Sequence, residues 1–210
     1  MVKVLISTVS EIAKTTDLAS ASNKLNIHFL NDQGYLFQDK MFVSTLGRLM
    51  LQRLFDDATI DASVLKTLHR GAYGKWQLSA PVDFNVSHAD DKIVAVFSDE
   101  GVVGVDIEKV RDFEWQGYKE SFSSAEWTTI YTAVYPEQIF FDLWTKKESI
   151  LKAYGYGLQI PLAQVSIENS FGQIESSSMT GYFNEVIIPG YKCYVCTQQQ
   201  TDLQLDTFIF

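Results

Sequence analysis

The segment Gly104-Val105-Asp106-Ile107-Glu108 most strongly constrains how this chain can fold. Its β-branched residues are typical of a strand, and successive side chains of a strand point to opposite faces. Asp106 and Glu108 therefore project together from one face. Two neighbouring carboxylates repel each other, and a divalent cation such as Mg²⁺ relieves that repulsion. The pair predicts a metal site, with two solvated acids on an exposed strand as the simpler alternative.

A helix predicted over 139–154 supplies further charged groups. Its apolar residues recur at helical spacing, which leaves Lys147, Glu148 and Lys152 on or near a polar face. Glu148 and Lys152 are four residues apart and are therefore neighbours on that face. A third carboxylate beside lysines suits a metal-bound phosphate group, because lysine supplies a point charge to phosphate oxygens. The alternative is a surface ion pair on a solvated helix.

Composition and charge argue against several classes of protein. The 210 residues carry 17 basic and 26 acidic side chains, a net charge of −9, which argues against a nonspecific nucleic-acid binder. A hydrophobic content of 46% fits a buried core. The sequence contains no uninterrupted run of about twenty apolar residues, the length that is needed to span a bilayer. The first residues lack the pattern of a secretory signal. We therefore expect a soluble, cytoplasmic monomer that binds neither nucleic acid nor membrane.

Cys193 and Cys196 lie in a strand predicted over 191–197. An offset of three residues places their side chains on opposite faces of that strand, so neither a disulfide nor a shared metal is expected between them. The three histidines of the chain are scattered, which argues against a zinc site. Any bound metal is therefore expected to be a hard cation held by oxygen.

The pattern of helices and strands predicts an α+β fold. In its first part, the chain is expected to form a strand, a long helix and three short strands, the last two joined by a turn at 99–101: 1–8, 41–55, 82–87, 93–98 and 102–108. In its second part, it is expected to form two helices and then four strands: 125–135, 139–154, 165–168, 173–177, 181–186 and 191–197. We divide it into an N-terminal α+β half, 1–102, and a C-terminal α+β half, 103–210, which carries the predicted metal site.

Five short motifs follow one another in a fixed order. They are Gly74-Lys75, Phe84-Asn85-Val86-Ser87-His88, Gly104-Val105-Asp106-Ile107-Glu108, Phe122-Ser123-Ser124-Ala125-Glu126, and Trp144-Thr145-Lys146-Lys147-Glu148-Ser149 continuing through Lys152 to Gly155-Tyr156-Gly157-Leu158. No single motif is specific, but the ordered set resembles the 4′-phosphopantetheinyl transferases of the surfactin-synthetase-activating type. Trp76 departs from the family, which often has proline at that position.

This resemblance implies a pseudo-dimer of two similar α+β halves, each a helix packed on a small antiparallel sheet, with the ligand in the cleft between them. It implies Mg²⁺-dependent transfer of the phosphopantetheine arm of coenzyme A to a serine of an apo-acyl or peptidyl carrier protein, with release of adenosine 3′,5′-bisphosphate. Mg²⁺ would be held by Asp106, Glu108 and Glu148. Coenzyme A would be bound through its phosphates by Lys75, Ser87, His88 and Lys152, of which Lys152 would contact the pyrophosphate.

The attacking serine must lose a proton, and a carboxylate within hydrogen-bond reach is the simplest base. Glu126 and Glu148 are the candidates, and Glu126 is preferred because metal coordination makes Glu148 a weaker base. Ser123 and Glu126 also have the spacing of a helix capping box, so Glu126 has a structural role as its alternative. Two other functions stay open: a Mg²⁺-dependent enzyme that cleaves a pyrophosphate with another acceptor, and a coenzyme A-binding module without turnover. The choice of carrier protein depends on surface complementarity.

Overall fold

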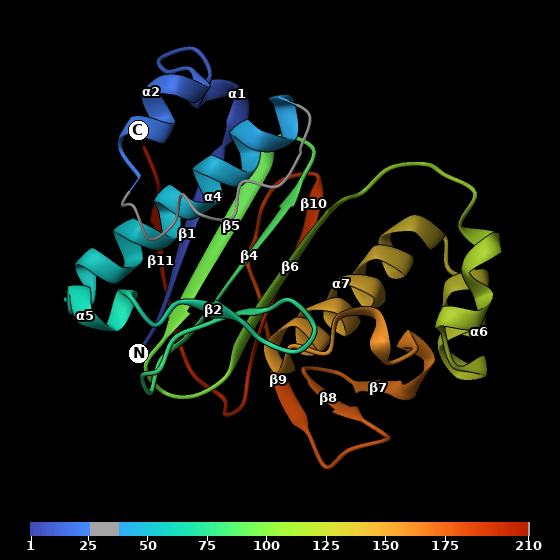
Figure 1. Ribbon diagram of the computed structural model, residues 1–210. Helices are drawn as coiled ribbons and strands as arrows, with labels where there is room; N and C mark the ends of the chain where they lie inside the picture. The colour runs from blue at the N-terminus through green and yellow to red at the C-terminus, as the bar shows by residue number, and fades with distance from the viewer. Residues whose placement is uncertain (26–37, 210) are drawn as a thin grey trace.

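A computed structural model describes residues 1–25 and 38–209, and it contains two main sheets (Figure 1). The first sheet has the strand order β11-β1-β5-β4 and is antiparallel apart from the parallel pair β1 and β11. Its strands are β1 (Val2–Thr8), β4 (Asp83–Ala89), β5 (Lys92–Ser98) and β11 (Leu203–Thr207).

The second sheet is antiparallel and has the order β6-β10-β9-β8-β7. Its strands are β6 (Val103–Lys109), β7 (Val165–Glu168), β8 (Phe171–Ile174), β9 (Thr180–Glu185) and β10 (Tyr191–Thr197). A separate small hairpin pairs β2 (His69–Arg70) with β3 (Trp76–Gln77).

The α-helices are α1 (Val9–Ile12), α2 (Leu18–Asn23), α4 (Gln38–Asp57), α5 (Ala62–Leu65), α6 (Ser124–Thr132) and α7 (Pro136–Tyr154). Short 3₁₀ helices are η1 (Trp115–Ser121), η2 (Gly157–Gln159) and η3 (Leu162–Gln164). Among the residues that the structure describes, no helix is both long and apolar enough to cross a membrane.

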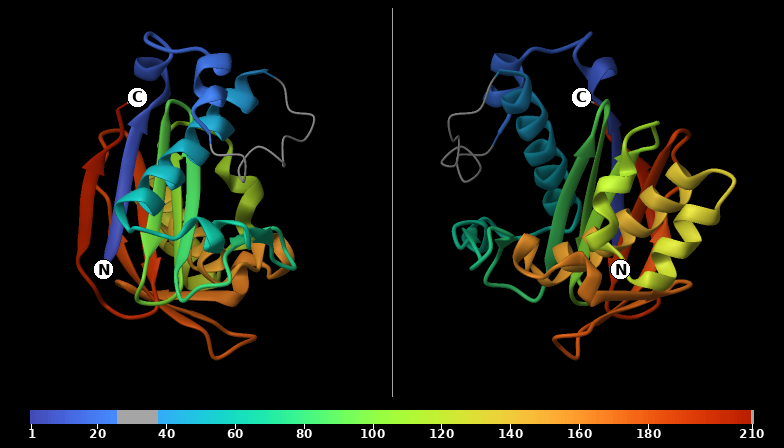
Figure 2. Two further views of the ribbon diagram at one scale, coloured as in Figure 1. Left: turned by 60° about the vertical axis from the view of Figure 1, so that its left-hand side comes forward. Right: turned by 90° about the vertical axis from the view of Figure 1, so that its right-hand side faces the viewer.

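The long helices and the two sheets form successive layers: α4, the first sheet, the second sheet and α7 (Figures 1 and 2). Alternation along β5 shows how the layers are joined, because both of its faces are buried. Phe97 packs in the cluster that contains the apolar side of α4, whereas Val96 packs with Val105 of β6 and Val195 of β10. The opposite face of the second sheet contributes Cys196 to the cluster beneath α7.

The predicted α+β class is confirmed, and most predicted elements are present within a few residues of the expected bounds. The turn at 99–101 does not return β5 onto β6 as a hairpin. Instead β5 pairs with β1 and β4, while β6 pairs with β10 in the other sheet. Burial of β6 on both sides accounts for this arrangement, since its valines face the first sheet and its alternate residues face α7.

Strand β11 was not predicted, because its five residues are mostly exposed and carry no strong apolar alternation. Residues 203–207 pair in parallel with β1, so this part of the expected 103–210 half completes the first sheet. The two sheets therefore do not divide the chain at a single point. Division into domains at residue 102 stays a prediction.

Candidate active site

The two sheets meet where β4 lies against β6, which are the end strands of their respective sheets. Side chains of β4 accept hydrogen bonds from backbone amides of β6 at this junction. Asp83 Oδ2 accepts a hydrogen bond from the Val103 amide at 2.8 Å, and Asn85 Oδ1 accepts one from the Val105 amide at 3.2 Å. Ser87 follows in the same row, because side chains two residues apart share one face of a strand.

Ser87 is the member of this row that contacts the predicted metal site. Its hydroxyl donates to Asp106 Oδ1 at 3.0 Å and accepts from Lys152 Nζ at 3.0 Å. Lys152 also forms an ion pair with Asp106. The structure thus brings together three predicted site residues that are contributed by β4, β6 and α7.

Close packing of α7 on β6 depends on Gly104. A Cβ at this position would lie 2.2 Å from the carbonyl oxygen of Ser149 and 2.3 Å from the amide nitrogen of Ala153. Only a residue without a side chain therefore lets the helix backbone rest on the strand at this distance. Gly104 shares its strand face with Asp106, so this approach also places Glu148 and Lys152 of α7 beside the carboxylates of β6.

Asp106 is the most buried carboxylate of the site, with a side chain 4% exposed. Burial raises its pKa, while Lys152 and Ser87 act in the opposite direction. Burial would lower the pKa of Lys152, but Asp106 reverses that effect and the pKa is raised overall. Asp106 Oδ2 is buried without a hydrogen-bond partner in the part of the chain that is described. A buried, unpartnered carboxylate oxygen is a natural cation ligand.

Asp106 acts electrostatically on the other two predicted metal ligands, Glu108 and Glu148. Burial raises the pKa of Glu108 to about 7, and repulsion from Asp106 and then Glu148 adds to that effect. Burial and then Asp106 raise the pKa of Glu148 in the same direction. The oxygens have not converged into ligand geometry, since no set of three acidic, histidine or cysteine side chains in the described residues is arranged to hold a metal. Their chemistry nevertheless fits Mg²⁺, which accepts one or two carboxylates and completes its shell with water and phosphate oxygens.

Lys75 was predicted near the phosphates of coenzyme A, and the structure places it at the β4–β6 junction. Its ammonium group forms an ion pair with Asp83 and donates to the carbonyl oxygens of Val103 at 3.0 Å and Ala153 at 2.7 Å. Burial lowers its pKa. These three acceptors match the three hydrogens of an ammonium group.

His88 is exposed and follows Ser87 on β4. Strand alternation places it in the row of Phe84 and Val86, whose side chains pack with the core on the α4 side. Of the predicted pair, Ser87 alone is therefore in the row that reaches Asp106. The cofactor contact of His88 stays a prediction.

Glu126 forms the capping box that its spacing indicated. Its Oε2 accepts from the Ser123 amide at 2.8 Å, and the Ser123 hydroxyl accepts from the Glu126 amide at 3.2 Å. The same oxygen forms an ion pair with Lys147 at 2.9 Å. Lys147 is fully buried and also donates to the carbonyl oxygens of Leu162 and Val165. Glu126 therefore has a structural role, and its role as a base stays a prediction.

Sequence analysis did not single out Asp83, although it holds both Lys75 and the Val103 amide. The available signal was the two-residue spacing of polar side chains along β4, at Asp83, Asn85 and Ser87. The expected separation of the cysteines is confirmed: both are buried, Cys193 between the sheets and Cys196 beneath α7.

Comparison with known proteins adds independent information. Residues 102–200 match the family model described as the 4′-phosphopantetheinyl transferase superfamily. The predicted resemblance to these transferases is confirmed. The matched region contains the carboxylates of β6, the capping box and all of α7.

Similar curated proteins carry the same name. The chain is 28% identical over 162 residues to 4′-phosphopantetheinyl transferase gsp of Aneurinibacillus migulanus, covering 73% of this chain and 68% of that enzyme. It is 33% identical to Sfp of Bacillus subtilis, over 54% of both chains, and 36% identical to AcpT of Salmonella typhimurium, over 52% of this chain and 56% of that enzyme. These relatives are all named transferases of the predicted class. The chain spans little more than half the length of the latter two relatives, so its own reaction requires a separate argument.

Proposed function

We propose that this protein transfers the 4′-phosphopantetheine arm of coenzyme A to a serine of an apo-carrier protein. The serine oxygen bonds to the phosphorus that carries pantetheine, and the pyrophosphate bond breaks to release adenosine 3′,5′-bisphosphate. The family match and the names of the relatives support this reaction. The single structural observation that carries the proposal is the meeting of Ser87, Asp106 and Lys152 across the β4–β6 junction.

This arrangement suits a pyrophosphate substrate. Lys152 is 29% exposed at the site, and its ammonium group can move from Asp106 to a phosphate oxygen. Ser87 then donates its hydroxyl hydrogen either to Asp106 or to the substrate. Once it has paired with the bound substrate, Lys152 can stabilise the negative charge that develops on the leaving phosphate.

Asp106, Glu108 and Glu148 are the residues that would hold Mg²⁺, which supplies charge neutralisation to the pyrophosphate when bound. Burial and then repulsion from Asp106 raise the pKa values of Glu108 and Glu148, which supports this assignment because buried, crowded carboxylates gain from a cation. Removal of the serine proton is assigned to Glu126 or Glu148. Glu148 acts electrostatically on the site, whereas Glu126 is held by Ser123 and Lys147.

The direct test is incubation with coenzyme A, Mg²⁺ and a panel of apo-acyl and apo-peptidyl carrier proteins, followed by intact-mass measurement. We expect one carrier to gain the mass of phosphopantetheine. The same carrier should show no mass gain when the metal is chelated. Asp106→Ala should abolish the transfer while leaving coenzyme A intact. Full activity of Asp106→Ala in saturating Mg²⁺ would contradict the site assignment.

The same mixtures separate the alternative functions. Release of free phosphopantetheine without a carrier indicates an enzyme that uses another acceptor, such as water. Binding of coenzyme A without any product, across the whole carrier panel, indicates a binding module. Either result would replace carrier modification as the function of this site.

A further inference from the structure

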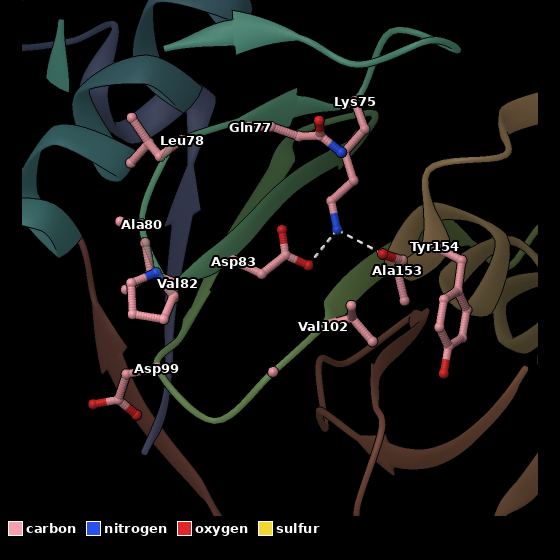
Figure 3. A pocket seen from close by; sticks show the side chains of 12 residues that line it. Lys75, Gln77, Leu78, Ala80, Val82, Asp83, Asp99, Val102, Ala153 and Tyr154 are labelled. Carbon is pink, nitrogen blue, oxygen red and sulfur yellow. Dashed lines mark hydrogen bonds and ion pairs between the residues drawn. The ribbon is translucent and has the colours of Figure 1, made fainter. Parts of the chain in front are cut away.

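A cavity of about 490 Å³ lies at the junction of the two sheets and is lined by Lys75, Asp83 and Ala153 (Figure 3). Lys75 extends into it from the loop before β3, past Asp83 of β4 and toward Ala153 at the end of α7. Tyr154, also from α7, lines the far wall. The cavity is therefore lined by both parts of the chain, and Lys75 connects them.

The contacts of Lys75 join three elements that are distant in sequence. Its ammonium group binds Asp83 of β4, the Val103 carbonyl of β6 and the Ala153 carbonyl of α7. Its stem packs against the turn that ends α7, where a Cβ on Gly155 would lie 3.3 Å from the Lys75 Cβ. Gly155 has a φ of 71°, a conformation that favours glycine and stops the helix at this point.

Asp83 completes the same arrangement from the other side. Its carboxylate accepts from both Lys75 and the Val103 amide. The side chains of Lys75 and Asp83 are only 6% and 16% exposed. Loss of either side chain would leave the other charge buried without its ion-pair partner, and a backbone group of β6 without its hydrogen bond. Such a loss is far more disruptive than the loss of an ion pair on the surface.

We propose that Lys75 and Asp83 form a junction clamp, in which both act as positioning residues. The clamp fixes the start of β6 and the end of α7 against β4. Asp83 and Ser87 belong to one row of β4 side chains, so a displacement of β6 at Val103 would also move Asp106 away from Ser87. The effect on turnover rests on the proposed function, whereas the effect on the junction does not.

This role differs from a phosphate contact. All three donors of Lys75 are engaged within the protein, and a phosphate could be bound only by giving up an acceptor in the clamp. Asp83 would repel a phosphate, so a phosphate-binding role for Lys75 gives Asp83 no direct contact with that phosphate. The two roles consequently predict different behaviour for Asp83→Asn.

The first experiment compares Lys75→Met and Asp83→Asn by thermal unfolding and by hydrogen exchange of the Val103 and Val105 amides, without coenzyme A or Mg²⁺. We expect each variant to lower Tm by several degrees and to speed exchange of the Val103 amide about tenfold or more. The double variant should lower Tm by less than the sum of the two single changes, because both single changes remove the same Lys75–Asp83 ion pair. If Lys75→Met does not fold, Lys75→Arg keeps the charge but changes the group that reaches the Val103 and Ala153 carbonyl oxygens, so we expect a smaller acceleration of Val103 amide exchange.

Lys109→Met is the matched control. Lys109 of β6 pairs with Asp90, which follows β4, at 2.7 Å, so this ion pair also crosses the junction. Its side chains are 45% and 50% exposed, and exposed pairs contribute little to stability. We expect Lys109→Met to leave both Tm and the exchange of the Val103 amide nearly unchanged.

The second experiment measures carrier modification by the same variants. The clamp predicts that Asp83→Asn and Lys75→Met both lower kcat about tenfold or more while changing KM for coenzyme A less than about threefold. Unchanged amide exchange in both variants would overturn the clamp. So would a loss of coenzyme A affinity in Lys75→Met with normal turnover in Asp83→Asn. If the wild-type protein modifies no carrier, the proposed function fails, and amide exchange still decides the clamp.

Discussion

Gly104 shows how one missing side chain determines the geometry of the site. The α7 backbone lies so close to it that a Cβ would be 2.2 Å from the Ser149 carbonyl oxygen. Gly104→Ala must displace the helix, so we expect a loss of at least about 1–3 kcal/mol in the free energy of unfolding, measured with urea. Gly117→Ala is the control, because a Cβ there would meet no atom within 4 Å. Equal stability of the two variants would contradict the close packing.

Glu126 and Glu148 can be separated by paired amide substitutions. Glu126→Gln keeps the acceptor for Ser123 but removes the counter-charge of the buried Lys147, so we expect lower stability whatever its role in catalysis. If Glu126 is also the base, transfer slows by about 10²–10⁴-fold with unchanged Mg²⁺ dependence. Glu148→Gln should instead raise the Mg²⁺ concentration needed for half-maximal activity. Normal turnover of Glu126→Gln beside an inactive Glu148→Gln, at every Mg²⁺ concentration, would leave Glu126 only its structural roles as capping residue and partner of Lys147.

Lys147 joins three elements of the second part of the chain. It extends from α7 to Glu126 of α6, to the Leu162 carbonyl of η3 and to the Val165 carbonyl where β7 begins. Burial lowers its pKa, and the Glu126 pair opposes that shift. The charge is therefore maintained by specific contacts in a buried position, and the orientation of α6 on α7 depends on it.

Lys147→Met tests this dependence on the scale of whole elements. We expect the variant to lose about 3–5 kcal/mol in the free energy of unfolding, because Glu126 is left buried with an unpaired charge. Exchange of the α6 amides should accelerate more than exchange of the β5 amides. Lys119→Met, on the exposed end of η1, is the control and should change stability by less than about 0.5 kcal/mol. Uniform acceleration across both sheets would contradict a local role.

On the scale of the whole molecule, the two sheets depend on each other for burial. Strand β11, from the end of the described chain, pairs with β1, and the valines of β1 and β5 are covered by those of β6 and β10. A fragment of residues 1–102 therefore lacks both an edge strand and the cover of one face. Apolar surface of this size is costly to expose, since burial contributes about 25 cal/mol per Å².

Separate fragments test this interdependence. We expect residues 1–102 alone to unfold without a cooperative transition, and addition of residues 103–210 to restore one, as followed by circular dichroism and size-exclusion chromatography. Restored carrier modification in the mixture would further show that the junction has formed. Cooperative unfolding of the isolated 1–102 fragment would contradict this expectation and support two independently stable domains.

Local periodicity was enough to predict most elements and several local features within them. A two-residue repeat placed Asp106 and Glu108 on one face of β6, and the three-residue offset placed the two cysteines on opposite faces. The spacing of Ser123 and Glu126 likewise predicted the capping box. These features depend on backbone geometry over a few residues, so they can be read directly from the sequence.

Tertiary structure alone decided which strands pair and which charges meet. The pairing of β11 with β1, the separation of β5 from β6, and the bond from Lys75 to a carbonyl 78 residues away join segments that no local pattern relates. The requirement for glycine at position 104 is also tertiary, because the backbone that leaves no room for a Cβ belongs to a helix some forty-five residues downstream. Buried polar groups must find partners wherever packing brings an acceptor or donor within reach. The sequence therefore determined the chemistry available at the site, and the packing of two sheets and two long helices determined which of those groups act together.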